Sequence, residues 1–212
     1  MSLKFMHPST MLVCGPTGCG KTQFVVRLIT EQMFDPVPER IIWIYGEWQP
    51  LYDNMKLRIP SIEFKNGIPA NFYDSITNES RNLVILDDQM SDAGDKKELS
   101  QLFTQGSHHR NLSVIYIVQN LFDQGRSMRT VSLNTQDLII FKNPRDKKQI
   151  TTLASQMYPK NGHFLTDAFL DATSEPFGYF LIDLHQNTPD EFRIRTKIFH
   201  GYVTVGYQPI GY

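Results

Sequence analysis

The sequence predicts a single α/β domain in which a mostly parallel β-sheet is covered by helices on both faces. Short, continuously apolar segments alternate along the chain with longer amphipathic or polar segments, and strands of this kind are typical of parallel sheets buried on both sides. A glycine-rich loop joins the first apolar segment to a helical one. The length of 212 residues fits one domain, with a core at about residues 9–200 and a C-terminal tail at about 201–212.

The expected strands are short runs rich in branched and aromatic residues, at 11–14, 40–45, 82–86, 113–118 and 137–141. Between and after them, helices are expected where apolar residues recur at helical spacing, at 22–33, 96–108 and 147–157. Two later runs, 178–182 and 192–195, are candidate edge strands, and the second alternates as if one side faced water. The segment 46–80 is rich in Pro, Asn and Gly and yields no assignment.

Composition excludes several classes of protein. The formal net charge is −1, so nucleic-acid binding would need a local basic surface. Because no run of about 18 apolar residues is present, we expect no membrane span, and the first residues do not resemble a secretory signal. The two cysteines, Cys14 and Cys19, are expected to be reduced thiols of an intracellular protein that act as small packing residues.

A phosphate-binding motif follows the first expected strand. The pattern G-x-x-x-x-G-K-[ST] is met by Gly15, Pro16, Thr17, Gly18, Cys19, Gly20, Lys21 and Thr22. The backbone of such a loop cradles phosphate oxygens, Lys21 is expected to reach the β- and γ-phosphates, and the Thr22 hydroxyl is expected to bind Mg²⁺. A chance match would lack the buried strand before the loop and the amphipathic helix after it. The N-K-x-D element of many GTPases is absent from the sequence, which favours ATP.

Two adjacent acids end the third expected strand. Asp87 and Asp88 follow four apolar residues, and parallel α/β sheets bind ligands at the carboxyl ends of their strands. We expect Asp87 to hold Mg²⁺, directly or through water, and Asp88 to orient or deprotonate an attacking water. Taken alone, the pair could equally be a solvated acidic turn. Its position after a phosphate loop and before a further strand predicts nucleotide hydrolysis.

The next expected strand ends at Gln119. An amide at this point can hydrogen-bond the γ-phosphate or the attacking water and so act as a sensor, or it can simply cap a turn. His108 and His109 lie before the same strand, and adjacent residues on a helix point in different directions. No cluster of Cys or acidic residues completes a coordination sphere, so a packing or phosphate-proximal role is expected for the two histidines.

The order of these features resembles the FtsK/HerA superfamily of DNA-pumping ATPases: a phosphate loop, paired acids, an arginine shortly before a strand, and a glutamine at the end of that strand. Within the superfamily, the runs 86–88 and 102–111 look like the packaging ATPases of poxvirus-type and other large or transposon-related DNA viruses. The segments 119–122, 132–134 and 141–146 extend the similarity, which covers roughly residues 9–200.

The resemblance implies a RecA-like P-loop NTPase fold and an ATPase, using ATP and Mg²⁺, that translocates double-stranded DNA in viral or virus-derived genome packaging. It implies a homo-oligomeric ring, a hexamer or pentamer, in which Arg110 reaches the nucleotide site of the neighbouring subunit. The resemblance also implies capsid proteins as possible partners and a location in the host cytoplasm, the nucleus or the virion.

Alternatively, Arg110 is a surface residue at a helix C-terminus, where a cation is favourable. No FtsK-type membrane region, HerA-type barrel or winged helix is evident, which implies a minimal motor core.

Basic residues gather between 126 and 148. This stretch contains two acidic residues, both aspartates, and six basic ones: Arg126, Arg129, Lys142, Arg145, Lys147 and Lys148. The excess of positive charge could face the channel of a ring and contact DNA phosphates, and the candidates for that contact are Arg126, Arg129, Lys142 and Arg145. It could equally be a solvated face, as most charge runs are.

Two other functions are compatible with a phosphate loop. A small P-loop kinase would need a mobile arginine-rich lid and an acceptor pocket, and the sequence contains no convincing lid. A domesticated ATP-binding module would keep the fold without motor activity, although the intact Lys21, Thr22, Asp87 and Asp88 argue against decay. The aromatic residues near the C-terminus predict either a disordered tail or an apolar patch that docks on a capsid or a neighbouring subunit.

Overall fold

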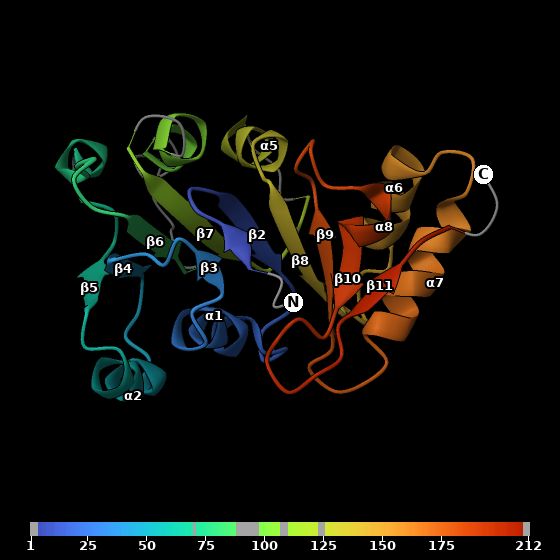
Figure 1. Cartoon of the computed structure of the whole chain (residues 1–212), viewed down its shortest axis with the longest axis horizontal. Helices are drawn as coiled ribbons and strands as arrows, with labels where there is room; N and C mark the ends of the chain where they lie inside the picture. Colours follow the sequence, from blue (N-terminus) through green and yellow to red (C-terminus); the bar gives the residue numbers. More distant parts are fainter. Residues whose placement is uncertain (1–3, 70, 88–97, 107–109, 123–125, 210–212) are drawn as a thin grey trace.

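The computed structural model describes residues 4–69, 71–87, 98–106, 110–122 and 126–209. Within these residues a nine-stranded sheet runs through the centre of the molecule. In sheet order its strands are β11 (Val205–Tyr207), β10 (Ile194–Thr196), β9 (Tyr179–Asp183), β8 (Asp137–Phe141), β2 (Thr10–Cys14), β7 (Leu112–Val118), β6 (Asn82–Leu86), β4 (Arg40–Tyr45) and β5 (Ile62–Asn66). Figure 1 shows β5 at one end of this row and β11 at the other.

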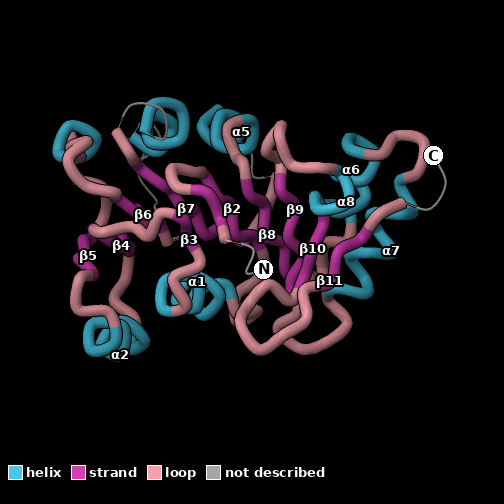
Figure 2. Tube along the Cα trace, in the orientation of Figure 1, coloured by secondary structure: helices cyan, strands magenta, loops and turns pink. Residues whose placement is uncertain are grey.

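The strands from β8 to β5 are all parallel, whereas β9, β10 and β11 pair with their neighbours in antiparallel fashion. The continuous apolar runs of the sequence occupy the parallel part, where both faces of a strand are covered. The predicted P-loop-type α/β fold, with a mostly parallel sheet between helices, is therefore confirmed (Figure 2).

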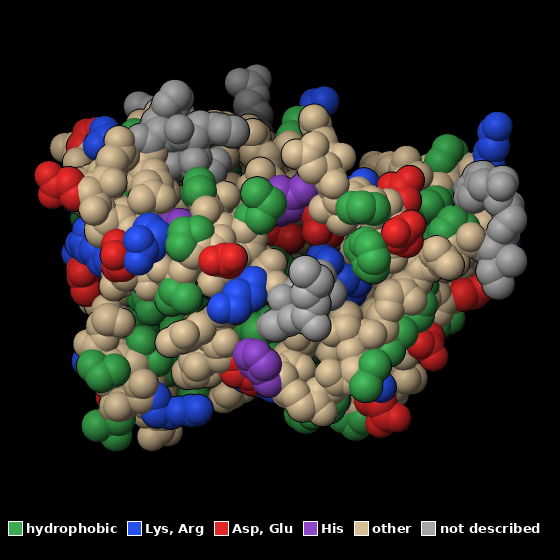
Figure 3. Space-filling model, in the orientation of Figure 1, with side chains coloured by type: hydrophobic (Ala, Val, Ile, Leu, Met, Phe, Trp, Pro, Cys, Tyr) green, Lys and Arg blue, Asp and Glu red, His purple; other side chains and the backbone are tan. Residues whose placement is uncertain are grey.

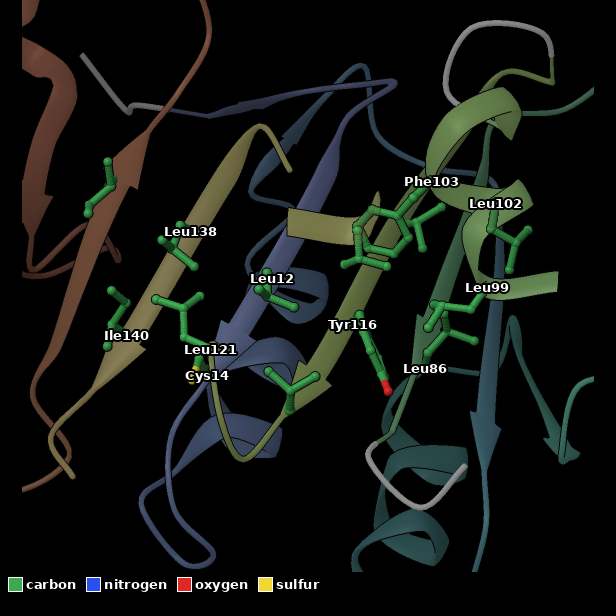
Figure 4. Packing of buried hydrophobic residues seen from close by; sticks show 14 of the residues in the cluster. Leu12, Cys14, Leu86, Leu99, Leu102, Phe103, Tyr116, Leu121, Leu138 and Ile140 are labelled. Carbon is green, nitrogen blue, oxygen red and sulfur yellow. The ribbon is translucent and has the colours of Figure 1, made fainter. Parts of the chain in front are cut away.

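Helices cover both faces of the sheet. On one face lie α1 (Lys21–Thr30) and α2 (Pro50–Arg58). On the other face lie the following elements: η1 (Phe72–Ser75), η2 (Leu102–Gly106), α5 (Arg126–Leu133), α6 (Lys148–Met157) and α7 (Gly162–Ala172). Successive strand residues point to opposite faces, so each face has a core of its own. Figure 4 shows strand residues Leu12 and Tyr116 on the same face as Leu102 and Phe103.

The prediction that 178–182 and 192–195 form edge strands was wrong. Strand β9 lies inside the sheet between β8 and β10. Residues 190–193 form a short helix, α8 (Asp190–Arg193), and β10 is buried rather than wetted on one side. Strand β10 is not an edge strand because β11, which belongs to the expected C-terminal tail, pairs with its outer side. The described part of that tail therefore extends the sheet.

The segment without an assignment, 46–80, contains α2, β5 and η1. A separate two-stranded pair joins β1 (Phe5–Met6) to β3 (Phe34–Asp35). The described part of the predicted helix 96–108 is helical, and η2 within it is a π-helix. Among the described residues, no helix combines the length and the apolar character that a membrane crossing requires.

Candidate functional site

The phosphate loop lies at the carboxyl end of β2, where the chain turns into α1. Gly18 and Gly20 have φ angles of 80° and 105°, which side-chain-bearing residues adopt only with strain. Gly15 is required for a different reason: a Cβ there would lie 2.7 Å from both the Cys19 Sγ and the Phe141 Cβ. The three glycines therefore allow the loop to curl tightly against the end of β8.

Lys21 begins α1 and turns back over the loop. Its Nζ donates hydrogen bonds to the carbonyl oxygens of Gly15, at 2.6 Å, and Pro16, at 3.0 Å, and the residue is only 9% exposed. The first turn of α1 contains no acidic residue, so its free N–H groups and the positive end of the helix dipole point at the loop without competition. The arrangement attracts an anion.

Asp87 directly follows β6 and is almost completely buried. The hydroxyl of Tyr52 donates a 2.7 Å hydrogen bond to its Oδ2, and the backbone N–H of Asp87 donates to the carbonyl oxygen of Ile44. Burial, followed by the negative charge of Asp87, raises the pKa of Tyr52 well above its ordinary value, so the phenol stays protonated and remains a donor. Tyr52 thus fixes the orientation of the Asp87 carboxylate. Asp88, the second acid of the motif, lies outside the described residues.

Gln119 follows β7 and is exposed at the same edge of the sheet. The strand end that carries it is held by Gln149 of α6. The Gln149 Oε1 accepts a 2.9 Å hydrogen bond from the backbone N–H of Leu121, and its Nε2 donates to Asp146 at 2.8 Å. The thiol of Cys14 lies 3.8 Å from the Gln119 carbonyl oxygen. Gln149 therefore ties the segment after β7 to the loop after β8.

Part of the phosphate loop, Asp87 and Gln119 line one open cavity of about 340 Å³. The residues in it that the sequence pointed to are Thr17, Gly18, Gly20, Lys21, Thr22, Asp87 and Gln119. Gln23, Gln49, Leu51 and Phe177 line it as well, and sequence reasoning missed all four, together with Tyr52. Only Gln23, one position beyond the motif, had a signal that would have found it; the others come from segments whose path the sequence did not reveal.

The oxygen atoms that face this cavity suit a magnesium ion. The hydroxyl-bearing Thr22 and the carboxylate of Asp87 line the same space, and Mg²⁺ prefers one or two protein oxygen ligands of this type and completes its shell with water and phosphate oxygens. Cys14 is buried and Cys19 is half-buried, and neither of them is in a disulfide. Burial raises the pKa of the Cys19 thiol, so it stays protonated beside the phosphate loop, and this agrees with a packing role.

Arg110 does not reach this cavity within its own chain. It precedes β7 and therefore lies at the amino end of the parallel strands, opposite the phosphate loop. Its Nη1 donates to the carbonyl oxygen of Ile76 at 2.9 Å, and its guanidinium stacks 4.9 Å from the centre of the Tyr73 ring. Asp74 lies 3.8 Å away. His108 and His109, just before it, lie outside the described residues.

The basic residues singled out for DNA contact are spread over two elements. Arg129 is exposed on α5, whereas Lys142 and Arg145 are exposed in the loop after β8. Arg126 begins α5, and its side chain lies outside the described part of the chain. On the face drawn in Figure 3, acidic and basic side chains are interspersed.

Comparison with known proteins adds whole-chain similarity in fold. No family model matches the sequence. A stretch of 39 residues, 18% of this chain, is 41% identical to packaging protein 1 of human adenovirus C serotype 5, and it spans only 9% of that protein. Among solved structures, B204, the DNA-packaging ATPase of Sulfolobus turreted icosahedral virus, superposes with a TM-score of 0.56 over 97% of this chain and 100% of its own, at 10% identity.

A second structure, the genome-packaging NTPase B204 of Sulfolobus turreted icosahedral virus 2 in complex with ATP-gammaS, gives a TM-score of 0.52 and 12% identity over 96% of this chain and 98% of its own. Both similarities extend over nearly the whole of each chain. This chain therefore has the P-loop NTPase fold in the form found in the viral genome-packaging NTPases, the group that its motifs resemble.

Proposed function

We propose that this protein is an ATP-hydrolysing motor that translocates double-stranded DNA and packages a viral or virus-derived genome. The observation that carries the proposal is the single cavity in which the phosphate loop, the acid after β6 and the glutamine after β7 come together. A phosphate loop alone requires only nucleotide binding. An acid and an amide on the neighbouring strands supply what hydrolysis needs in addition.

In this proposal each residue has a distinct chemical task. Lys21 and the N-terminus of α1 neutralise charge on the β- and γ-phosphates. Thr22 and Asp87 would hold Mg²⁺, which supplies positive charge at the phosphate oxygens when it is bound. Asp88, one position beyond the carboxylate that Tyr52 orients, takes the proton of the attacking water, and Gln119 hydrogen-bonds that water or the γ-phosphate.

Ring assembly gives Arg110 a role that it cannot have in a single chain. Because Arg110 lies at the opposite edge of the sheet from its own phosphate loop, it can act only on the nucleotide of a neighbouring subunit. A guanidinium inserted there stabilises the charge that develops during phosphoryl transfer. Hydrolysis would then depend on assembly into a hexamer or pentamer. The exposed cations Arg129, Lys142 and Arg145, together with Arg126, are the proposed contacts to DNA phosphates.

The experiment that tests this proposal is the rate of phosphate release from ATP, with and without double-stranded DNA, across a range of protein concentrations. We expect the rate per subunit to rise cooperatively with concentration, because a neighbour completes each site, and to rise further with DNA. Heparin serves as the matched polyanion control. A rate that responds to neither DNA nor concentration contradicts the motor and favours a phosphotransferase or a binding module.

The role of Arg110 is tested in mixed rings. A chain with Arg110→Ala is expected to bind ATP normally and to lose turnover, and added Lys21→Met chains, which lack their own site but carry Arg110, should restore part of it. Arg81→Ala is the matched control, because Arg81 is also a partly exposed arginine held by a carbonyl and an acid of its own chain. Full turnover by assembled Arg110→Ala rings contradicts a role in trans.

A further inference from the structure

A second, smaller cavity adjoins the phosphate cavity on the side away from Asp87 and Gln119. It has a volume of about 240 Å³ and is lined by Gly20, Gln23, Phe24, Arg27, Phe141, Phe177, Tyr179 and Phe199. The two cavities share three residues: Gly20, Gln23 and Phe177. A molecule anchored in the phosphate loop can therefore extend directly into an aromatic pocket.

Phe177 forms the boundary between the two cavities and is unusual in two respects. The residue is 71% exposed, although burial of a phenyl ring contributes about 2 kcal/mol or more to stability. Its φ angle is 61°, a conformation that costs a residue with a bulky side chain about 1–3 kcal/mol. Strain and exposure at one residue beside a binding cavity point to a function for that ring.

The ring of Phe177 lies directly on the phosphate loop. A Cβ added to Gly20 would lie 3.2 Å from the Phe177 Cδ1, so a larger residue there would require the ring to shift by a few tenths of an ångström. The turn that presents the ring is closed by Gly178, whose N–H donates to the carbonyl oxygen of Glu175 at 3.0 Å. A Cβ at Gly178 would lie 2.7 Å from the carbonyl oxygen of Ala172. The backbone is thus built to hold Phe177 in place.

The floor of the pocket is a rigid set of packed rings. Phe24 lies edge-on to Tyr179, with centroids 4.7 Å apart, and to Phe199, at 5.1 Å. The guanidinium of Arg27 covers the Phe199 ring at 4.1 Å and pairs with Glu31 at 2.6 Å. Flat apolar surfaces of this kind, with one exposed ring at the rim, suit a flat aromatic ligand.

We propose that Phe177 and this pocket are the subsite for the base of the bound nucleoside triphosphate, which is held by stacking on the Phe177 ring. The inference rests on the proposed nucleotide site and extends it to the other end of the ligand. The expected orientation of the nucleotide agrees with this position of the base. If the γ-phosphate lies toward Asp87 and Gln119, the ribose and base leave the phosphate loop on the opposite side, where the aromatic pocket lies.

The test compares the affinity for ATP with that for inorganic triphosphate, both with Mg²⁺, by calorimetry on the wild-type chain and on Phe177→Ala. Stacking of a base on an aromatic ring accounts for roughly a 5- to 150-fold difference in affinity. We expect Phe177→Ala to lose ATP affinity within this range and to bind triphosphate as the wild type does, while Phe177→Trp keeps both affinities. Phe192→Ala is the matched control, because Phe192 is half exposed on α8 and lines neither cavity.

The outcomes separate the subsite from the function on which it rests. If the wild type binds neither ATP nor triphosphate, the nucleotide site itself is wrong. If it binds both equally well, or if Phe177→Ala binds ATP as tightly as the wild type, the phosphate site stands and the base subsite is overturned. An equal loss of both ligands in Phe177→Ala also overturns it, since the ring would then support the loop rather than a base.

Discussion

Charged residues lie both at the carboxyl ends of the parallel strands, the carboxyl edge of the sheet, and at their amino ends, the amino edge. The two sets differ in what the charges contact. At the carboxyl edge, Lys21 and Asp87 line an open cavity. At the amino edge, where β8 begins, Asp137 lies in a buried cluster with Asp183, His185 and Arg195. The Asp183 carboxylate accepts hydrogen bonds from His185 Nδ1, at 2.8 Å, and from Arg195 Nη2, at 2.9 Å.

The pairing in the buried cluster is incomplete, and this affects its titration. Burial raises the pKa of Asp137 to about 7, although the positive charge of His185 opposes this. The hydrogen bond to Asp183 raises the pKa of His185. Burial opposes ionisation of Asp183, but the hydrogen bonds from His185 outweigh it and lower the pKa of Asp183. Asp183, His185 and Arg195 also line a cavity of about 800 Å³, so facing a cavity does not by itself separate the two sets of charges. The difference lies in their partners: the charges of the cluster pair with one another and hold the fold together, whereas Lys21 and Asp87 bond to carbonyl and phenol groups, and their charges are the ones proposed to act on a ligand.

The largest expected effect comes from breaking the buried cluster. Arg195→Met leaves the Asp183 carboxylate without its 2.9 Å partner, and removal of one member of a buried ion pair costs about 3–5 kcal/mol. Urea unfolding should show this loss, with ATP affinity unchanged under folding conditions. Arg58→Met, at an exposed position on α2, is the control and should cost less than about 0.5 kcal/mol. Equal free energies of unfolding for the two variants would show that the buried cluster does not stabilise the fold.

At the carboxyl edge, a substitution is expected to reduce turnover and to leave the free energy of unfolding nearly unchanged. Asp88→Asn should bind ATP normally and lose at least about 100-fold in turnover, because it removes the group proposed to accept the proton of the attacking water. The free energy of unfolding should stay within about 0.5 kcal/mol of the wild type. Single-turnover hydrolysis and calorimetry measure the two quantities separately. Normal hydrolysis by this variant would show that Asp88 does not act on the water.

The pH dependence of stability should report the buried cluster. Asp137 has a folded pKa of about 7 against a usual value of 3.8, so the stability it contributes is complete below pH 3.8 and is lost as pH rises through 7. His185, whose pKa is also raised, loses its contribution in the same direction. The unfolding free energy should therefore fall between about pH 4 and pH 7 through Asp137 and further above pH 6.5 through His185, by at most about 1.4 kcal/mol per pH unit for each proton.

Asp137→Asn is expected to flatten this pH profile, because the carboxyl group that titrates near neutrality is removed. The measurement is urea unfolding of both chains at a series of pH values. Asp183 acts with the opposite sign, since its lowered pKa gives stability above pH 3.8 that is lost only on acidification. A variant profile as steep as that of the wild type would assign the titration to another group.

The smallest effect is expected for Tyr52→Phe. The change removes the 2.7 Å hydrogen bond to Asp87 and should cost about 1 kcal/mol of stability. If Tyr52 orients the carboxylate for Mg²⁺, the metal concentration that gives half-maximal turnover should rise while turnover at saturating metal stays near the wild-type value. Tyr45→Phe serves as the control, because it removes one hydroxyl from a tyrosine that packs against the Tyr52 ring and leaves the hydrogen bond from Tyr52 to Asp87 in place. Identical metal dependence in the two variants would refute the positioning role.

The sequence predicted the parallel half of the molecule well, for a physical reason. Strands β6 and β8 are continuous apolar runs, and their boundaries match the expected 82–86 and 137–141. The phosphate loop could be recognised because its glycines and Lys21 lie within eight consecutive residues, although it also packs against Phe141. Asp87 and Gln119 could be placed because the carboxyl ends of parallel strands meet at one edge.

The remainder depends on contacts that no local pattern reveals. Helix α2 is mostly polar and is held in place mainly by buried Tyr52 and Met55, so 46–80 gave no signal. Strand β11 has three residues and exists because β10 pairs with it. Phe177 is one aromatic residue in a turn, and its relation to the phosphate loop appears only once the antiparallel strand β9, which follows it, pairs its first residue, Tyr179, with Phe141 at the end of β8.

The central claim is that the cavity at the carboxyl edge binds and hydrolyses ATP. It is tested most directly by the rate of phosphate release from ATP in parallel preparations of wild-type and Lys21→Met chains. Because Lys21 is the residue proposed to supply positive charge at the phosphates, we predict a loss of at least about 100-fold in turnover with little change in the free energy of unfolding. Hydrolysis by Lys21→Met at the wild-type rate would contradict the claim.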